Sequence, residues 1–174
     1  MSDPYPPSHA ATAAHAAEAA EEWAERHHYL PAGLPQPAPY PEGLAKEFWE
    51  GTRRHELLVQ RCNGCQTWQW GPEFICYNCH SSDLRYERVA PEGRIFSWER
   101  PWYPVHPALQ QAVPYIVVLV ELPGAGGVRM VGNLLGDPHQ EIVIGSAVQA
   151  VFEDHDDAGT PTPYTLVQWR VVAG

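Results

Sequence analysis

The sequence predicts a mainly β protein, in which a short helix and a metal-binding ribbon precede a small barrel of five strands. Three observations predict it. Proline makes up 18 of 174 residues, about twice its usual share, and each interior proline removes a helix donor, which excludes a mostly helical chain. Two Cys-x-x-Cys pairs lie ten residues apart. Five runs rich in Val, Ile, Tyr and Trp follow them.

Residues 1–41 are expected to form an arm outside the main domain. The stretch from Ala10 to His28 is rich in Ala and Glu and has a high helix propensity, but most of its apolar side chains are Ala. Five prolines between residues 31 and 41 then predict an extended linker. Such an arm drapes over the domain, docks on a partner or stays disordered, and the sequence leaves these alternatives open.

Residues 42–60 are expected to form a helical segment, with its helix from about Glu42 to Glu50. Pro41 suits a helix start and Gly51 suits a helix stop. The apolar run Leu57-Leu58-Val59 then predicts a strand that leads into the first cysteine pair.

Residues 61–86 are expected to form a ribbon around one structural zinc ion. Two residues between cysteines make a tight knuckle that aims both sulfurs at one point, and two knuckles complete a tetrahedral four-thiolate shell. Gly64 is expected to ease the first knuckle, and Asn78 is expected to tolerate a left-handed conformation in the second. A closed shell leaves no open coordination position and no free thiol nucleophile. The expected ligands are Cys62, Cys65, Cys76 and Cys79.

Residues 87–174 are expected to form the five-stranded domain. Clusters of Gly, Pro and Asp separate its apolar runs, and five strands in this length fit a small closed barrel of the OB kind or a sandwich fragment. The Gly-rich run 124–127 predicts a hairpin loop, because it lacks the G-x-G-x-x-G order of a phosphate loop. The expected strands are Ile95 to Tyr103, Tyr115 to Leu122, Val128 to Leu135, Ala147 to Glu153 and Tyr164 to Val172.

The polar residues do not combine into a self-contained active site. No serine lies in a G-x-S-x-G context, and four of the nine histidines lie in the expected arm. Three more, His106, His139 and His155, lie in expected loops and are interpreted as solvated side chains. We therefore expect no catalysis by this chain alone.

Composition also bears on partners and compartment. The chain has 21 acidic and 11 basic residues, a formal net charge of −10. An acidic chain lacks the basic surface of a nucleic-acid binder, so a single-stranded nucleic-acid-binding OB protein is only an alternative, as is an iron-containing electron carrier. No apolar run is long enough for a membrane span, and the first 25 residues hold no apolar core of a signal peptide, so a cytoplasmic location is expected.

Several blocks resemble one known family in their order along the chain. These blocks are Phe48-Trp49, the run from Leu57 to Cys65, Pro72 four residues before Cys76, the run from Gly93 to Ser97, the run from Pro114 to Leu122 and the run from Ile144 to Val148. Over residues 42–172 the chain is similar to the acyl-CoA-associated family with a rubredoxin-like zinc ribbon and an OB-fold domain. Two residues depart from the family pattern, because Gln66 and His80 stand where many relatives have Gly. The arm has no counterpart that we recognise.

The resemblance implies a function for the chain. Members of this family resemble accessory subunits of thiolase-superfamily proteins, including lipid-transfer-type thiolases, and some such pairs are aldolases that trim steroid side chains as CoA thioesters. We therefore predict a non-catalytic acyl-CoA-binding subunit of a thiolase-like aldolase, in a hetero-oligomer for which a heterotetramer is the working hypothesis. The alternative is an accessory subunit of a thiolase or acyltransferase that works by Claisen chemistry.

A CoA thioester needs Arg near its phosphates and an apolar slot for its acyl arm, and aromatic side chains crowd the ribbon. These aromatic side chains either pack on the β-domain or form a recognition surface. The predicted acyl-CoA- or partner-binding residues are Phe48, Trp49, Arg53, Arg54, Arg61, Trp68, Trp70 and Phe74.

Overall fold

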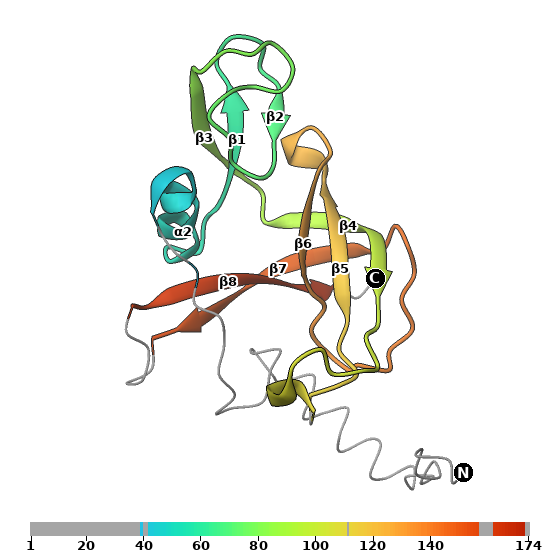
Figure 1. Cartoon of the computed structure of the whole chain (residues 1–174). Coiled ribbons are helices and arrows are strands. Elements are labelled where there is room, and N and C mark those ends of the chain that lie inside the picture. Colours follow the sequence, from blue (N-terminus) through green and yellow to red (C-terminus); the bar gives the residue numbers. More distant parts are fainter. Residues whose placement is uncertain (1–38, 40–41, 111, 157–161, 173–174) are drawn as a thin grey trace, which may run out of the picture.

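The computed structural model describes residue 39 and residues 42–110, 112–156 and 162–172 (Figure 1). The expected arm at residues 1–41 therefore lies outside the described residues, apart from Pro39. The helical elements are η1 (Gly43–Ala45), α2 (Lys46–Thr52), η2 (Pro107–Leu109) and η3 (Pro123–Ala125). The strands are β1 (Leu57–Cys62), β2 (Trp68–Gln69), β3 (Leu84–Val89), β4 (Glu92–Glu99), β5 (Val117–Leu122), β6 (Val128–Asn133), β7 (Ala147–His155) and β8 (Tyr164–Val171).

The strands form two antiparallel sheets, as predicted for a ribbon followed by a barrel. The first sheet has the order β2-β1-β3 and the second has the order β6-β5-β4-β7-β8. An isolated bridge between Leu134 and Trp169 brings the end of β6 against β8, so the second sheet nearly closes into a barrel. Figure 1 shows the ribbon projecting above the barrel. The predicted fold class is confirmed.

Alternation of apolar side chains explains the barrel strands. In β5, Val118, Val120 and Leu122 are buried, while the residues between them are only half-buried. This period of two places one face of the strand in the core, where Trp169 of β8 is also fully buried. The first expected strand, Ile95 to Tyr103, begins earlier and ends at Glu99. Pro101, which cannot donate a ladder hydrogen bond, follows that end.

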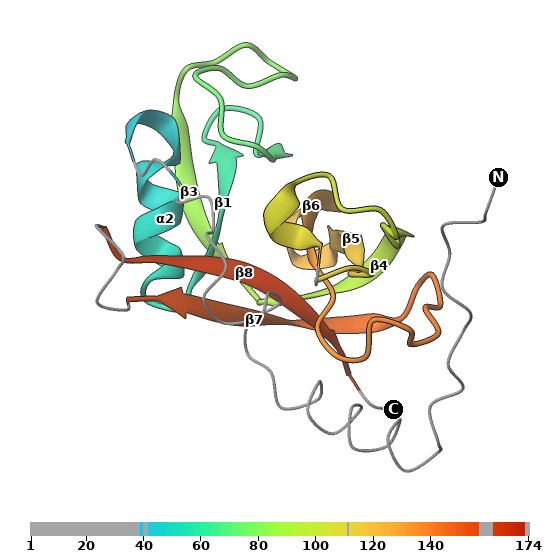
Figure 2. The same ribbon diagram turned by 60° about the horizontal axis from the view of Figure 1, so that its bottom comes forward.

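The helix continues beyond its expected end. Gly51 was expected to stop it, but α2 runs to Thr52 and Gly51 is buried inside it. A Cβ atom at Gly51 would lie 2.6 Å from Leu58 Cδ1, so the glycine allows close packing of α2 on β1. Figures 1 and 2 show α2 beside the ribbon and close to the β7–β8 hairpin, in agreement with the contacts of α2 with β1 and β8.

The connection between β5 and β6, which belongs to the barrel, packs against the ribbon. It is a hairpin loop, as the Gly-rich run predicts, and Gly126 in it has a φ of 64°. A Cβ atom there would lie 2.8 Å from Trp68 Cδ1, so the indole of β2 rests on this loop. Within the described ranges, no helix has the length and apolarity needed to cross a bilayer.

Candidate metal centre

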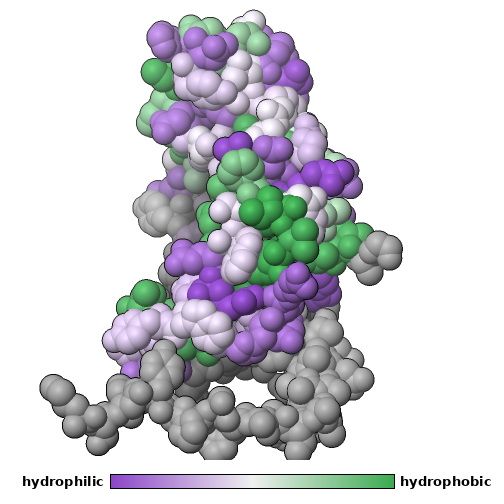
Figure 3. Space-filling model, turned by 90° about the vertical axis from the view of Figure 1, so that its right-hand side faces the viewer, coloured by the Kyte–Doolittle hydropathy of each residue, from purple (hydrophilic) through white to green (hydrophobic). Residues whose placement is uncertain are grey.

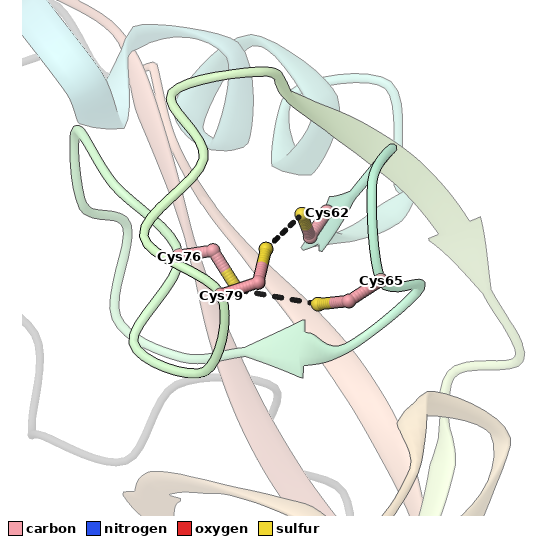
Figure 4. Close-up of side chains that lie close together, drawn as sticks. All are labelled: Cys62, Cys65, Cys76 and Cys79. Carbon is pink, nitrogen blue, oxygen red and sulfur yellow. Dashed lines mark hydrogen bonds between the residues drawn. The ribbon is translucent and has the colours of Figure 1, made fainter.

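The four cysteines converge on one point at the projecting end of the ribbon (Figure 4). All four Sγ atoms lie within 4.8 Å of one another, and the Cys62–Cys79 and Cys65–Cys76 Sγ atoms are 3.5 Å apart. A tetrahedral zinc site with Zn–S bonds of ~2.3 Å places its sulfurs about 3.8 Å apart. The donor set and its spacing therefore fit one zinc ion with four thiolate ligands, as predicted.

The backbone of the knuckles explains this convergence. The N–H of Gln66 donates to the carbonyl of Cys62 at 2.9 Å, and the N–H of His80 donates to the carbonyl of Cys76 at the same distance. Gln66 and His80 have φ values of 62° and 60°. The left-handed residues are thus the ones that follow each knuckle.

Asn78 was expected to tolerate a left-handed conformation, but its backbone does not adopt one, and His80 does so instead. Its side chain instead donates to Thr67 Oγ1 at 3.2 Å. Gln66 and His80 are also the two residues that depart from the family pattern, since many relatives have Gly at these positions. Gly adopts left-handed backbone without a steric cost, whereas Gln66 and His80 do not.

Hydrogen-bonding neighbours shift the pKa values of Cys65 and Cys79 in opposite directions. The Thr67 hydroxyl, hydrogen-bonded to Cys65 Sγ at 3.1 Å, acts with the Thr67 backbone and Asn78 to lower the pKa of Cys65 to about 5. The backbone N–H of Ser81 favours the thiolate of Cys79, but hydrogen bonding to the other cysteines outweighs it and raises the pKa of Cys79 to about 12. The lowered pKa favours the thiolate form of Cys65, and the thiolate is the form that binds metal.

The predicted aromatic residues divide between the core and the surface. Phe48 is buried, and its ring lies edge-on to Trp49 and Trp70, with centroid distances of 5.0 and 4.7 Å. Trp68 is half-buried beneath the guanidinium of Arg61, which lies 4.7 Å from the ring centroid. Phe74 is 73% exposed.

The predicted arginines have partners within the chain. Arg53 Nη1 donates to the carbonyl of Pro163. Arg54 Nε donates to Glu56 at 3.0 Å. Arg61 Nη1 donates to Glu87 at 2.9 Å. Hydrogen bonds from Arg61 and from Arg85 lower the pKa of the Glu87 carboxyl, although partial desolvation raises it. Binding of acyl-CoA or a partner by the eight named residues stays a prediction.

One histidine lies elsewhere than expected. His155 belongs to β7 rather than to a loop and is 7% exposed. Its Nε2 lies 2.8 Å from Glu153 Oε1, and its ring stacks on Tyr164 at 4.6 Å. Gln168 Nε2 donates to the other oxygen of Glu153 at 2.9 Å. The sequence-based interpretation missed this network because it ended the strand two residues too early.

A second pair of polar residues was also missed. Gln60 in β1 and Gln69 in β2 are paired in register and are 5% and 3% exposed. Gln69 Nε2 donates to Gln60 Oε1 at 2.7 Å. A polar residue directly after the apolar run 57–59 was the available signal, because a buried amide must find partners for its donors and acceptors.

Comparison with known proteins assigns both parts of the chain to one family. Residues 49–85 match the model of the rubredoxin-like zinc ribbon domain of ChsH2, and residues 86–153 match the model of its C-terminal OB-fold domain. Among solved structures, a chain of the Ltp2-ChsH2(DUF35) aldolase is 31% identical, with a TM-score of 0.62. The match covers 78% of this chain and 98% of that chain.

Two curated relatives are longer. A probable enoyl-CoA hydratase alpha subunit of Thermomonospora curvata is 37% identical over 102 residues, which are 58% of this chain and 31% of the relative. The 3-oxo-4,17-pregnadiene-20-carboxyl-CoA hydratase alpha subunit of Mycobacterium tuberculosis is 30% identical over 153 residues, which are 82% of this chain and 46% of the relative. The chain thus spans between about a third and a half of the length of these relatives.

Proposed function

This chain belongs to the ChsH2 family of zinc-ribbon and OB-fold proteins, and on that premise we propose that it is the non-catalytic, acyl-CoA-binding subunit of a heteromeric thiolase-like aldolase. The partner is an Ltp2-type protein of the thiolase superfamily, and the assembly is a hetero-oligomer in which a heterotetramer is the stoichiometry to test. The reaction is retro-aldol cleavage of a steroid-type side-chain CoA thioester. The match to 98% of one chain of an Ltp2-ChsH2(DUF35) aldolase carries this proposal.

Coverage favours an aldolase subunit over a hydratase. The two relatives named as hydratase alpha subunits match this chain over only 31% and 46% of their length, so their names describe much more protein than the matched part. The aldolase component is matched almost completely. The substrate name of the longer match, a pregnadiene carboxyl-CoA, supports a steroid-type acyl group for this chain as well.

The metal centre supports a division of labour between the subunits. Retro-aldol cleavage requires a base for the hydroxyl proton and donors for the enolate oxygen that forms as the carbon–carbon bond breaks. All four cysteines of the chain converge on the metal centre, and a closed four-thiolate site has no open position for substrate. We therefore assign the base and the enolate donors to the partner and a structural role to zinc.

The acyl-CoA contacts are proposed on the helix and ribbon. Arg53 donates to a neutral carbonyl, whereas Arg54 and Arg61 donate to carboxylates. The charge of Arg53 also acts on the carboxylate of Asp154, so a CoA phosphate at Arg53 would replace a neutral acceptor and add to an existing electrostatic contact. Half-buried Trp68, which lies under the guanidinium of Arg61, and half-buried Trp70 supply apolar surface. For the division of the chain, we propose an arm at 1–41, a helical segment at 42–60, a ribbon at 61–86 and a barrel at 87–174. Strand β1 crosses the boundary between residues 60 and 61.

Co-expression tests the proposed function directly. The full chain is produced with the Ltp2-type protein encoded in the same genome and, in parallel, with Ltp2 of the solved aldolase. We expect a stable complex by native mass spectrometry, and release of a ketone and a shortened acyl-CoA from a β-hydroxyacyl-CoA with a steroid side chain. Turnover by the isolated chain, or the absence of a complex with both proteins, would refute the proposal. Thiolysis or condensation without retro-aldol cleavage would establish the Claisen alternative instead.

A further inference from the structure

One loop of the ribbon exposes three large apolar side chains. In the loop at residues 71–79, Phe74 is 73% exposed, Ile75 is 52% exposed and Tyr77 is 68% exposed. We call these three residues the 74–77 surface. Exposed apolar side chains that gather in one place mark interaction sites more often than scattered ones do.

Buried glutamine amides hold the first part of this loop. Gln60 Nε2 donates to the carbonyl of Glu73 at 3.0 Å, and the N–H of Glu73 donates to Gln60 Oε1 at 3.0 Å. Gln60 thus bonds the Glu73 backbone in both directions, as a neighbouring strand would. Gln69 fixes the amide of Gln60 in turn, because its Nε2 donates to Gln60 Oε1.

Further contacts hold the rest of the loop. Gln69 Nε2 lies 3.4 Å from the carbonyl of Ile75, and the N–H of Tyr77 lies 3.4 Å from Gln69 Oε1. Between them, Cys76 directs its sulfur into the metal centre, and its N–H donates to the carbonyl of Ser81 at 2.8 Å. The backbone that carries the exposed side chains is therefore tied on both sides, and a surface that is ordered before binding loses less entropy when it binds.

We propose that the 74–77 surface docks into an apolar pocket of the Ltp2-type partner, and that Gln60 and Gln69 are positioning residues that hold it in its binding form. This inference rests on the proposed function and names the ribbon surface that the partner recognises. The ribbon projects from the barrel (Figure 1), so side chains exposed on its loop do not enclose a small ligand, and the partner must supply the concave side. Residues 71–79 include one acid and no base, which disfavours a nucleic acid as the occupant.

The barrel presents a competing apolar surface. Figure 3 shows a hydrophobic patch on the face that lies at the right of Figure 1, where the connection between β6 and β7 runs. Val143 and Ile144 in this connection are 58% and 64% exposed. Among the described residues, no side chain hydrogen-bonds the backbone of Val143 or Ile144, and the bond there is from the Ser146 N–H to the Val143 carbonyl, in contrast to the backbone of the 74–77 surface. This patch therefore supplies a matched control of similar exposure.

The test measures the affinity of the full zinc-loaded chain for the partner that binds the wild type in co-expression. We expect the double variant Phe74→Ser/Tyr77→Ser to weaken binding at least about 30-fold, since buried aromatic anchors dominate interfaces. We expect the matched control Val143→Ser/Ile144→Ser to bind within about threefold of the wild type. Zinc content and the melting temperature of each variant show that it is folded.

A second variant tests the positioning role. Gln60→Leu keeps all three exposed side chains but removes both hydrogen bonds to Glu73. We expect about tenfold weaker binding, with faster hydrogen exchange at the amides of Glu73 and Tyr77, while one zinc ion per chain is retained. Unchanged exchange and affinity would remove the positioning role of the glutamines.

The outcomes separate this inference from the proposed function. If the wild type forms the complex and Phe74→Ser/Tyr77→Ser binds equally well, the docking surface is wrong and the subunit role stands. If the control variant loses affinity instead, the barrel patch is the interface. If the serine variant loses only self-association, the occupant is a second copy of this chain. If the wild type binds no Ltp2-type protein, the proposed function falls and this inference falls with it.

Discussion

At the residue scale, the knuckles place two residues with side chains in left-handed backbone. Left-handed backbone costs an L-residue roughly 1–2 kcal/mol, and a substitution by Gly removes this cost. The greater conformational entropy of Gly in the unfolded state takes back roughly 0.5–1 kcal/mol of that stabilisation. We expect His80→Gly to raise the free energy of unfolding by about 0.5–1 kcal/mol. Urea unfolding of the zinc-loaded protein measures this change.

The other knuckle supplies the control. Gln66 Nε2 donates to the carbonyl of Asn63 at 2.7 Å, so Gln66→Gly loses a hydrogen bond as it relieves the backbone. We expect a smaller gain than for His80→Gly, or none. A loss of stability in His80→Gly would show that its imidazole contributes more than the backbone costs.

Asp154 connects the barrel to the turn after α2, and its charge makes this connection depend on pH. His55 Nε2 lies 2.9 Å from Asp154 Oδ2, and the Thr165 hydroxyl donates to Oδ1 at 2.7 Å. Partial burial raises the pKa of Asp154, but these hydrogen bonds and the positive charges of His55 and Arg53 outweigh it, so that the pKa lies below the ordinary value of 3.8.

A depressed folded-state pKa stabilises the protein above the unfolded pKa, and this stabilisation is lost as the pH falls through the folded value. We expect Asp154→Asn to be less stable than the wild type at pH 5–6, and the difference in unfolding free energy to shrink below about pH 3.8. Both proteins share the zinc site, so acid release of zinc cancels in the difference. A difference that grows as the pH falls would contradict this account.

At the element scale, α2 packs on β1 through Gly51 as well as through the buried ring of Phe48. Alanine at position 51 would favour an isolated helix by roughly 1 kcal/mol. Its Cβ would, however, lie 2.6 Å from Leu58 Cδ1 and 3.3 Å from the carbonyl of Glu56. We therefore expect Gly51→Ala to lower the free energy of unfolding by about 1–3 kcal/mol, because overpacking separates the two elements.

Thermal or urea unfolding checks this prediction against Lys46→Ala in the same helix. That control removes only an exposed pair with Glu50 at 3.7 Å, and we expect a change of at most about 0.5 kcal/mol. A stabilised Gly51→Ala variant would mean that propensity outweighs packing and that α2 moves away from β1.

At the scale of the whole molecule, the metal centre and the core share one strand. Cys62 ends β1, while Leu57 and Val59 of the same strand are buried in the core with Phe48. Loss of zinc should therefore unfold the ribbon and loosen α2, whereas the five-stranded sheet keeps its own ladders. We expect Cys62→Ser, or chelation of the wild type, to remove hydrogen-exchange protection from β1–β3 while β4–β8 stay protected.

Metal analysis of the same samples should give one zinc ion per wild-type chain. His80→Ala should retain it, since His80 follows the knuckle without being a ligand. Protection that survives complete zinc removal would show that the metal is not structural. Equal loss of protection in both sheets would show that the chain unfolds as one cooperative unit.

Local patterns determined much of this architecture. The two Cys-x-x-Cys pairs fix which sulfurs meet, because the knuckle is formed by residues that are neighbours in the chain. The alternation of apolar residues likewise determined strands such as β5, because a period of two follows from backbone geometry alone. The hairpin between β5 and β6 was also predictable from a local pattern, because a glycine-rich run between two apolar runs favours a turn.

Only the tertiary structure decided which distant groups meet. His55 and Asp154 are 99 residues apart in the sequence and form a pair because α2 packs beside the β7–β8 hairpin. The sequence predicts Gly51 as a helix stop, but its role is to allow the close approach of Leu58, which the sequence does not show. Gln60 is an isolated polar residue in the sequence, and its role depends on the loop that it bonds. Spacing reports the geometry of the local backbone, whereas burial and hydrogen-bond partners depend on sheet register and packing, which are set by contacts across the whole chain.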